Sequence, residues 1–252
     1  PGTSIPEVFD QAEPIWRRAR RQARHQRDQG LRQLLGVDSG SGASSTWLWM
    51  GWQPLARWSP LLKLPHGAWR ADGAALPQQP SVQGGTWVQL PEQRGICSVA
   101  LSDGPVDSGE IAPRHPVSVV QVSPEIWRVS NGLVEFECSP VGLLQLRDAQ
   151  GVDQLSAPLR PCRYRDRGEF WDAWGIAAEY RRHPLALEPA GSVQRPASGP
   201  LVAQLVVTYR VGASRMRLDL RLKADCPWLE LIVSVDWCQR HELLRLDIPL
   251  AS

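Results

Sequence analysis

The residues best suited to chemistry in this sequence form a short aromatic segment with a carboxylate at its centre. Asp172 lies between Trp171 and Trp174, and a charged stretch at 165–167 precedes them. A carboxylate can accept hydrogen bonds from sugar hydroxyls, and an indole ring can stack on the C–H face of a sugar. The segment therefore predicts a carbohydrate-binding site made by these three residues. The alternative is a structural Asp172 that accepts hydrogen bonds from loop amides while both indoles pack beneath it.

The rest of the sequence offers no catalytic or metal-binding pattern. It contains no GxSxG, GxGxxG, HExxH or P-loop motif, and its five His residues lack metal-ligand spacing. A glycosidase carboxylate pair cannot be chosen by spacing, because the two partners usually come from distant strands. Arg240 and His241 are expected to contact solvent from an edge strand. Cys97 and Cys238 have no neighbouring base or helix start that would make them reactive.

Composition favours a turn-rich β protein. The chain has twelve Trp but only three Phe and three Tyr. Its 22 Pro and 21 Gly indicate many short elements joined by turns. A net charge of +2 predicts no nucleic-acid binding over the whole surface. Five Cys without CxxC spacing indicate reduced thiols, and we expect a cytoplasmic protein. No apolar run approaches the roughly 20 residues that span a bilayer, so no membrane partner is expected.

The first 36 residues predict a helical segment. Ser4 and Glu7 have the spacing of a capping box. Apolar residues follow every three or four positions, at Phe9, Ala12, Trp16, Ala19 and Ala23. Pro14 lies within this stripe and predicts a kink or a break. The opposite face carries Arg17, Arg18, Arg20, Arg21, Arg24 and Arg27, which is typical of a solvated helix face.

After a Gly/Ser-rich stretch at 36–45, the pattern changes to short alternating segments. Strands are expected at 46–52, 59–64, 86–90, 117–122, 126–129, 133–138, 201–211, 215–223, 229–237 and 243–250. Residues 215–222 alternate polar and apolar, which predicts one buried face, and Asn131-Gly132 predicts a turn. No strand–helix–strand alternation appears. The fold class is therefore predicted as mainly β, a partial antiparallel β-sandwich preceded by an N-terminal helix.

Several segments share their order and spacing with one known family. They are 1–8, 49–60, 131–133, 165–174 with Tyr180, and 235–244. Together they resemble the non-catalytic half of family 38 glycoside hydrolases, α-mannosidases of the bacterial and cyanobacterial type. The most specific match is 170–174, which resembles the family's Phe/Trp-Trp-Asp-Ala-Trp signature. The chain departs from the family pattern at Gln53, Gly175, Cys238 and Glu242.

The resemblance implies retaining hydrolysis of α-mannosides, with one carboxylate as nucleophile and a second as acid and base. In the full-length enzyme, a zinc ion would coordinate sugar hydroxyls. The family's carboxylates and most of its zinc ligands lie in a catalytic domain that would precede Pro1. No catalytic residue or metal ligand is therefore assigned to this chain, and we expect it to bind no zinc. The expected partners are an α-mannoside or oligosaccharide, and the catalytic domain in cis or in trans.

The resemblance also implies three parts. Residues 1–40 would be a helical-bundle remnant, 46–112 a small β region, and 113–252 an incomplete large β-sandwich domain. The predicted function is that of a non-catalytic, carbohydrate-binding fragment of a zinc-dependent retaining α-mannosidase. One alternative is a free-standing carbohydrate-binding β-sandwich protein. A second is a nucleic-acid-binding protein that uses the Arg-rich helix, whose binding would fall steeply with salt.

Overall fold

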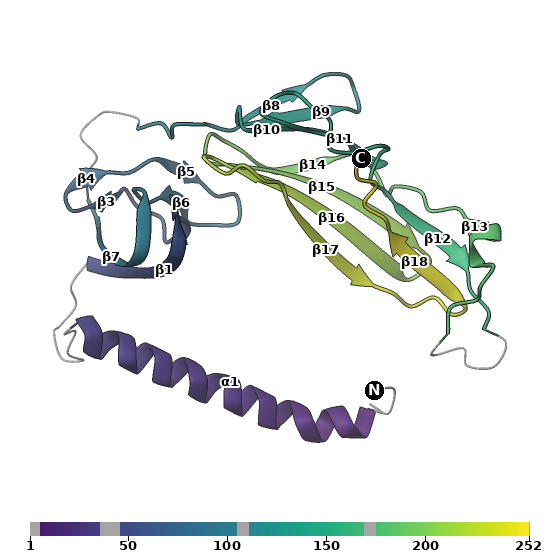
Figure 1. Cartoon of the computed structure of the whole chain (residues 1–252), viewed down its shortest axis with the longest axis horizontal. Helices are drawn as coiled ribbons and strands as arrows, with labels where there is room; N and C mark the ends of the chain where they lie inside the picture. The colour runs from purple at the N-terminus through teal and green to yellow at the C-terminus, as the bar shows by residue number, and fades with distance from the viewer. Residues whose placement is uncertain (1–5, 36–45, 105–110, 169–174, 252) are drawn as a thin grey trace. The chain divides into compact units, whose positions relative to one another are not determined.

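The chain folds into one long helix followed by antiparallel β-sheets (Figure 1). A computed structural model describes residues 6–35, 46–104, 111–168 and 175–251. Two compact units are present, Pro1–Ser45 and Thr46–Ser252. The prediction of a mainly β fold behind an N-terminal helix is confirmed. Within the described residues, no helix is both long and apolar enough to cross a membrane.

The first unit contains helix α1, Pro6–Leu35. Phe9 and Trp16 meet edge-to-face on its apolar stripe, with ring centroids 6.4 Å apart. Arg17 pairs with Glu13 one turn earlier, at 2.7 Å. The helix runs through Pro14 without a break, so the predicted split into two helices is wrong, and the kink stays a prediction. Pro14 removes a single N–H donor, which one continuous helix can tolerate.

The second unit begins with a small β region of two sheets. One has the order β1-β7-β3-β4, with bounds Thr46–Trp58, Gln93–Asp103, Trp69–Ala71 and Ala74–Ala75. The other has the order β2-β6-β5, with bounds Leu61–Leu64, Thr86–Gln89 and Gln78–Pro80. Trp69, Val88 and Leu101 form the centre of its core. The Trp69 indole N–H donates to the Pro65 carbonyl at 3.0 Å, so this Trp fills a core rather than a binding surface.

The large β region has three further sheets, in the orders β11-β10-β9-β8, β14-β15-β16-β17 and β13-β12-β18. The strand bounds are β8 Ser118–Gln121, β9 Trp127–Ser130, β10 Val134–Ser139, β11 Gly142–Asp148, β12 Pro161–Arg165, β13 Pro184–Leu185, β14 Gln194–Ser198, β15 Val202–Val211, β16 Ser214–Lys223, β17 Glu230–Asp236 and β18 Glu242–Leu246. A 3-10 helix, η1, covers Tyr180–Arg182. Each strand range expected from the sequence overlaps an observed strand.

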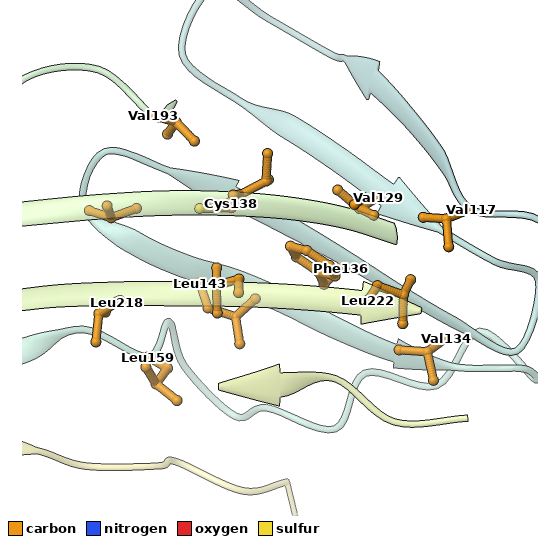
Figure 2. Close-up of a cluster of buried hydrophobic side chains, with 14 of the residues drawn as sticks. Val117, Val129, Val134, Phe136, Cys138, Leu143, Leu159, Val193, Leu218 and Leu222 are labelled. Carbon is orange, nitrogen blue, oxygen red and sulfur yellow. The ribbon is translucent and has the colours of Figure 1, made fainter. Parts of the chain in front are cut away.

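The first two sheets of the large region pack face to face around one core (Figure 2). Alternate residues of β16 are buried in it, as the pattern at 215–222 predicts: Met216, Leu218, Leu220 and Leu222. Phe136 and Cys138 of β10 meet them from the opposite sheet. The outer face of β16 is not wholly solvated. Asp219 is also buried there, and its Oδ2 accepts a hydrogen bond from Gln204 Nε2 at 2.6 Å.

Gln79 joins the small β region to the large one. It lies on β5 and is 5% exposed. Its Oε1 accepts the backbone N–H groups of Leu201 and Val202, both at 2.8 Å, and its Nε2 donates to the Val202 carbonyl at 3.0 Å. Gly199 leaves room for this amide, because a Cβ there would lie 2.4 Å from the Gln79 Cδ. The side chain thus binds backbone groups at the end of the turn between β14 and β15.

Asp225 makes a second link between the small and the large β region, beside Gln79. Its carboxylate accepts hydrogen bonds from Gln89 Nε2 at 2.8 Å and from the His115 backbone N–H at 2.7 Å. The Asn131 side chain donates to the Cys226 carbonyl at 2.8 Å in the same corner. The hydrogen bond between Gln89 and Asp225 crosses the boundary at 112 and 113 that the resemblance implies, and that division stays a prediction.

Burial separates the cysteines into accessible and inaccessible thiols. All five are free in the structure. Cys138 is fully buried, and desolvation raises the pKa of its thiol to about 12, whereas Cys238 is exposed. Because the thiolate is the nucleophile, a short pulse of iodoacetamide at about pH 8 should label Cys238 and spare Cys138 until the protein unfolds. Peptide mass spectrometry checks this, and equal labelling of both in the folded state would contradict it.

Candidate functional site

The three residues predicted to bind sugar lie outside the described residues. Trp171, Asp172 and Trp174 fall within 169–174, so their role stays a prediction. The structure does describe the chain up to 168 and from 175 onwards. These flanks lie at one end of the β13-β12-β18 sheet, which is where the candidate site is built.

Strand pairing brings two of the segments with family resemblance together at that end. Strand β12 pairs antiparallel with β18, and its last residue, Arg165, lies opposite Glu242. The next residue, Asp166, continues the ladder because its N–H donates to the His241 carbonyl at 2.8 Å. Residues 165–166 and 241–242 of the two segments therefore meet, although they are distant in the sequence.

Asp166 also closes the base of the loop that leaves β12. Its Oδ1 accepts the backbone N–H of Ala177 at 2.8 Å. Beside it, the Arg165 N–H donates to the His183 carbonyl at 2.9 Å. The two ends of the loop are thus held at one place on the sheet. A base of this kind lets a loop carry a binding residue without disturbing the strand hydrogen bonds.

An ion pair joins the central strand β12 to the edge strand β18 beneath the loop base. Arg163 Nε and Nη2 donate to the two oxygens of Glu242, both at 2.6 Å, and Nη1 donates to the Ala186 carbonyl at 3.0 Å. The two side chains are only 17% and 15% exposed. The hydrogen bond to Glu242 raises the pKa of Arg163 above its ordinary value. A carboxylate bound in this bidentate way is occupied as an acceptor, so the geometry gives Glu242 a structural part.

An aromatic and cationic cluster anchors η1 to the same sheet. The rings of Tyr164 and Tyr180 meet edge-to-face with centroids 5.2 Å apart. The guanidinium groups of Arg245 and Arg181 lie 5.3 and 5.7 Å from the centroid of the Tyr180 ring. Burial, followed by the neighbouring Cys162, raises the pKa of the Tyr164 hydroxyl. The phenol therefore stays neutral at physiological pH and acts as a packing surface.

Arg240 and His241 lie in the turn between β17 and β18, and both are exposed. His241 has a φ of 54°, and its carbonyl is the acceptor for Asp166. The sequence predicted solvent contact from an edge strand. The structure places that contact in a turn instead, because β17 ends at Asp236.

Three features of this end were not identified from the sequence: the Arg163–Glu242 pair, the Asp166 closure and the Tyr180 cluster. No spacing signal could reveal the ion pair, because its partners are 79 residues apart. Across the described ranges, no three His, Cys, Asp or Glu residues come together in a way that could hold a metal ion. The described residues therefore offer no donor set for zinc.

The fold is an antiparallel β domain. Its segments 165–174 and 235–244 resemble a glycosidase family in sequence. Residues 129–252 match the glycosyl hydrolases family 38 C-terminal domain. The resemblance to family 38 is thereby confirmed for this part of the chain.

The chain is also similar to two curated proteins. The chain is 24% identical to human alpha-mannosidase 2C1 over 178 residues, which are 64% of this chain and 17% of the human protein. It is 22% identical to mouse alpha-mannosidase 2C1 over 178 residues, with the same shares of each chain. The chain thus spans less than a fifth of the length of the curated relatives it matches.

Proposed function

We propose that this chain serves a family 38 α-mannosidase as a non-catalytic part that contacts the sugar. One observation supports the proposal above the others. The β12–β18 pairing sets residues 165–166 beside 241–242 at one end of a sheet, where Asp166 forms hydrogen bonds of 2.8 Å with the Ala177 N–H and the His241 carbonyl. A sheet end with a fixed loop base is a suitable support for a binding loop.

The proposed roles within the chain follow from side-chain chemistry. Trp171 or Trp174 stacks on the sugar ring, and Asp172 accepts a hydrogen bond from a hydroxyl. Arg163 and Glu242 hold the sheet that carries the loop. The proposed ligand is an α-mannoside or an oligosaccharide that ends in one.

Hydrolysis itself is proposed to need a catalytic domain of the family, joined in cis or bound in trans. Zinc, when bound there, would hold and polarise two sugar hydroxyls. The described residues of this chain give no donor set for that ion and no residue assigned to attack the anomeric carbon. The contribution proposed for this chain is binding and orientation of the sugar.

Sugar binding is the first test. Titration of the purified chain with methyl α-mannoside and an α-linked mannobiose, followed by NMR or calorimetry, should give saturable binding. Asp172→Asn should weaken it about tenfold, the effect of losing roughly 1.4 kcal/mol from a charge-assisted hydrogen bond, with little change in Tm.

Trp228→Ala is the matched control, because Trp228 is 59% exposed and far along the chain from the loop. It should leave sugar binding unchanged. If Asp172→Asn lowers the stability by about 1–3 kcal/mol and leaves binding intact, Asp172 is a structural residue that satisfies loop amides. Tight glycan binding by a stable monomer would favour a free-standing carbohydrate-binding protein instead.

Catalysis is the second test. The purified chain should release no 4-nitrophenol from 4-nitrophenyl α-mannoside, with or without added zinc. The reason is that no residue of the chain matches the family's nucleophile. Turnover that copurifies with the chain and disappears when one of its own carboxylates is changed would refute the non-catalytic assignment.

A further inference from the structure

Asn131 is the one Asn of the sequence, and Gly132 follows it directly. An Asn-Gly pair is especially prone to deamidation, because Gly has no Cβ that would hinder attack by its backbone nitrogen. The Gly132 nitrogen bonds to Asn131 Cγ, and Nδ2 leaves as ammonia with the proton that this nitrogen loses. Water then opens the cyclic imide, which gives Asp or isoaspartate in place of Asn. In an unfolded chain, this pair of residues is therefore a site of spontaneous modification.

The folded chain uses the full hydrogen-bonding capacity of the Asn131 side chain. Its Oδ1 accepts the backbone N–H groups of Leu133 and Val134, both at 2.9 Å. Its Nδ2 donates to two backbone carbonyls, that of Lys223 at 2.9 Å and that of Cys226 at 2.8 Å. A side-chain amide has two donor protons and an oxygen with two lone pairs, so every one of them has a partner. At 4% exposure, the residue is also closed to water.

The attacking nitrogen is held as well, because the Gly132 N–H donates to Ser130 Oγ at 3.2 Å. Attack makes the planar amide of Asn131 tetrahedral, which moves Oδ1 and Nδ2 away from the positions that suit their four partners. The two N–H donors on Oδ1 would stabilise an oxyanion there, which favours the reaction. The leaving group decides against it. Nδ2 has to gain a proton to leave as ammonia, and the two carbonyls beside it have no proton to give.

We propose that Asn131-Gly132 is a modification site that the native fold protects and that unfolding opens to deamidation, after which the chain cannot return to its native state. Two of the four protecting hydrogen bonds end on Lys223, the last residue of β16, and on Cys226 beyond it. Loosening of the turn at 130–134 alone is therefore not enough, because the corner that joins it to 223–226 must also come apart. The proposal is independent of sugar binding, since none of these residues lies in the loop at 169–174.

Either product of deamidation removes contacts that the native corner needs. A carboxylate in place of the Asn131 amide turns an oxygen toward the carbonyls of Lys223 and Cys226, so three acceptors meet with no proton between them. Burial of such a charge without donors is unfavourable. Isoaspartate moves Cβ from the side chain into the backbone, so the turn loses the spacing that sets Oδ1 against Leu133 and Val134. Unfolding thus becomes irreversible once the amide is lost.

The rate of deamidation in the folded and the unfolded chain is the first experiment. Trypsin releases residues 129–147 as one peptide, and fragmentation in a mass spectrometer locates the change from amide to carboxyl at Asn131. At mildly alkaline pH, the chain in guanidinium chloride should deamidate as fast as a synthetic peptide of the same sequence. The folded chain should be at least about a hundredfold slower, because opened molecules are a small fraction of the population. Equal rates in the two states would overturn the proposal.

Asp72→Asn is the matched control, because it creates a second Asn-Gly pair with the native Gly73. Both residues are exposed in the turn between β3 and β4, and their positive φ values of 49° and 81° suit an Asn-Gly turn. In the folded variant, position 72 should deamidate at least about tenfold faster than Asn131 in the same molecules. Equally slow reaction at both positions would overturn the assignment of protection to the four hydrogen bonds of Asn131.

Refolding tests the second half of the proposal. Wild-type chain that is partly deamidated in guanidinium chloride is diluted into buffer and separated by size exclusion, beside a sample that was unfolded only briefly. The folded fraction should contain peptide 129–147 with its amide intact, and the deamidated peptide should be confined to the unfolded and aggregated chain. Asn131→Asp, made directly, should unfold at a lower urea concentration than the wild type. Deamidated peptide in the folded fraction at its starting proportion, or an unchanged urea midpoint for Asn131→Asp, would overturn this half.

Discussion

Replacing Gln79 with Ala is expected to lower the free energy of unfolding by about 3–5 kcal/mol. The change leaves the buried backbone N–H groups of Leu201 and Val202 without their acceptor, and each unsatisfied group costs about 1–3 kcal/mol. The Val202 carbonyl loses one of its two donors and keeps the Gly199 N–H. The space that the side chain leaves is partly closed by Gly199, which already lies against it. Urea unfolding followed by Trp fluorescence measures the loss.

Two further variants show whether the amide itself is responsible. Gln79→Glu keeps the acceptor but turns a carboxylate oxygen toward the Val202 carbonyl, so it should also destabilise the protein. Gln83→Ala is the matched control, since Gln83 is exposed on the turn after β5, and it should change the stability by less than about 0.5 kcal/mol. A loss below about 1 kcal/mol for Gln79→Ala would mean that water replaces the amide at the joint.

Arg163→Ala is expected to cost about 2–4 kcal/mol. Removing one partner of a buried ion pair costs about 3–5 kcal/mol because the other charge is left unpaired, and partial exposure of this pair reduces the figure. The variant also loses the hydrogen bond to the Ala186 carbonyl. Thermal and urea unfolding measure the effect, with exposed Arg182→Ala as the control that should be close to neutral.

A charge reversal distinguishes pairing from packing at this position. Glu242→Lys sets two cations face to face and should destabilise at least as much as Arg163→Ala. Adding Arg163→Glu to it restores opposite charges and should recover part of the loss. If the double variant is no better than Glu242→Lys alone, the stabilisation comes from the stems of the side chains and not from the ion pair.

The sequence predicts strands well where one face is buried and the other is solvated. Alternation in β16 and β10 has this cause, and both strands lie where the pattern puts them. The sequence pattern does not predict β12, Pro161–Arg165, because its Pro and two Arg interrupt the apolar character expected of a buried strand. Arg163 is acceptable inside that sheet only because Glu242 neutralises it, and the chain supplies Glu242 79 residues later. The local sequence around Arg163 therefore cannot indicate this partner.

The candidate site was predictable to the same limited extent. The segment with Trp171 and Asp172 stands out by composition, and its tie to 235–244 follows from family resemblance alone. What the structure adds is the loop base, in which Asp166 meets both Ala177 and His241. A carboxylate that accepts backbone N–H groups leaves no signature in residue types, because any exposed Asp looks alike in a sequence.

Asn131 shows how this architecture must limit the order of assembly. Its Oδ1 accepts the nearby N–H groups of Leu133 and Val134, so the turn before β10 can form as soon as it is synthesised. Its amide group, however, donates to the carbonyls of Lys223 and Cys226, 92 and 95 residues further on. In a nascent chain leaving the ribosome, the Asn131 amide group therefore lacks its acceptors until β16 has emerged. Contacts between residues so far apart in the sequence make folding slow. During that interval the apolar face of β10 stays uncovered, which makes it the segment where chaperone binding during synthesis is expected to concentrate.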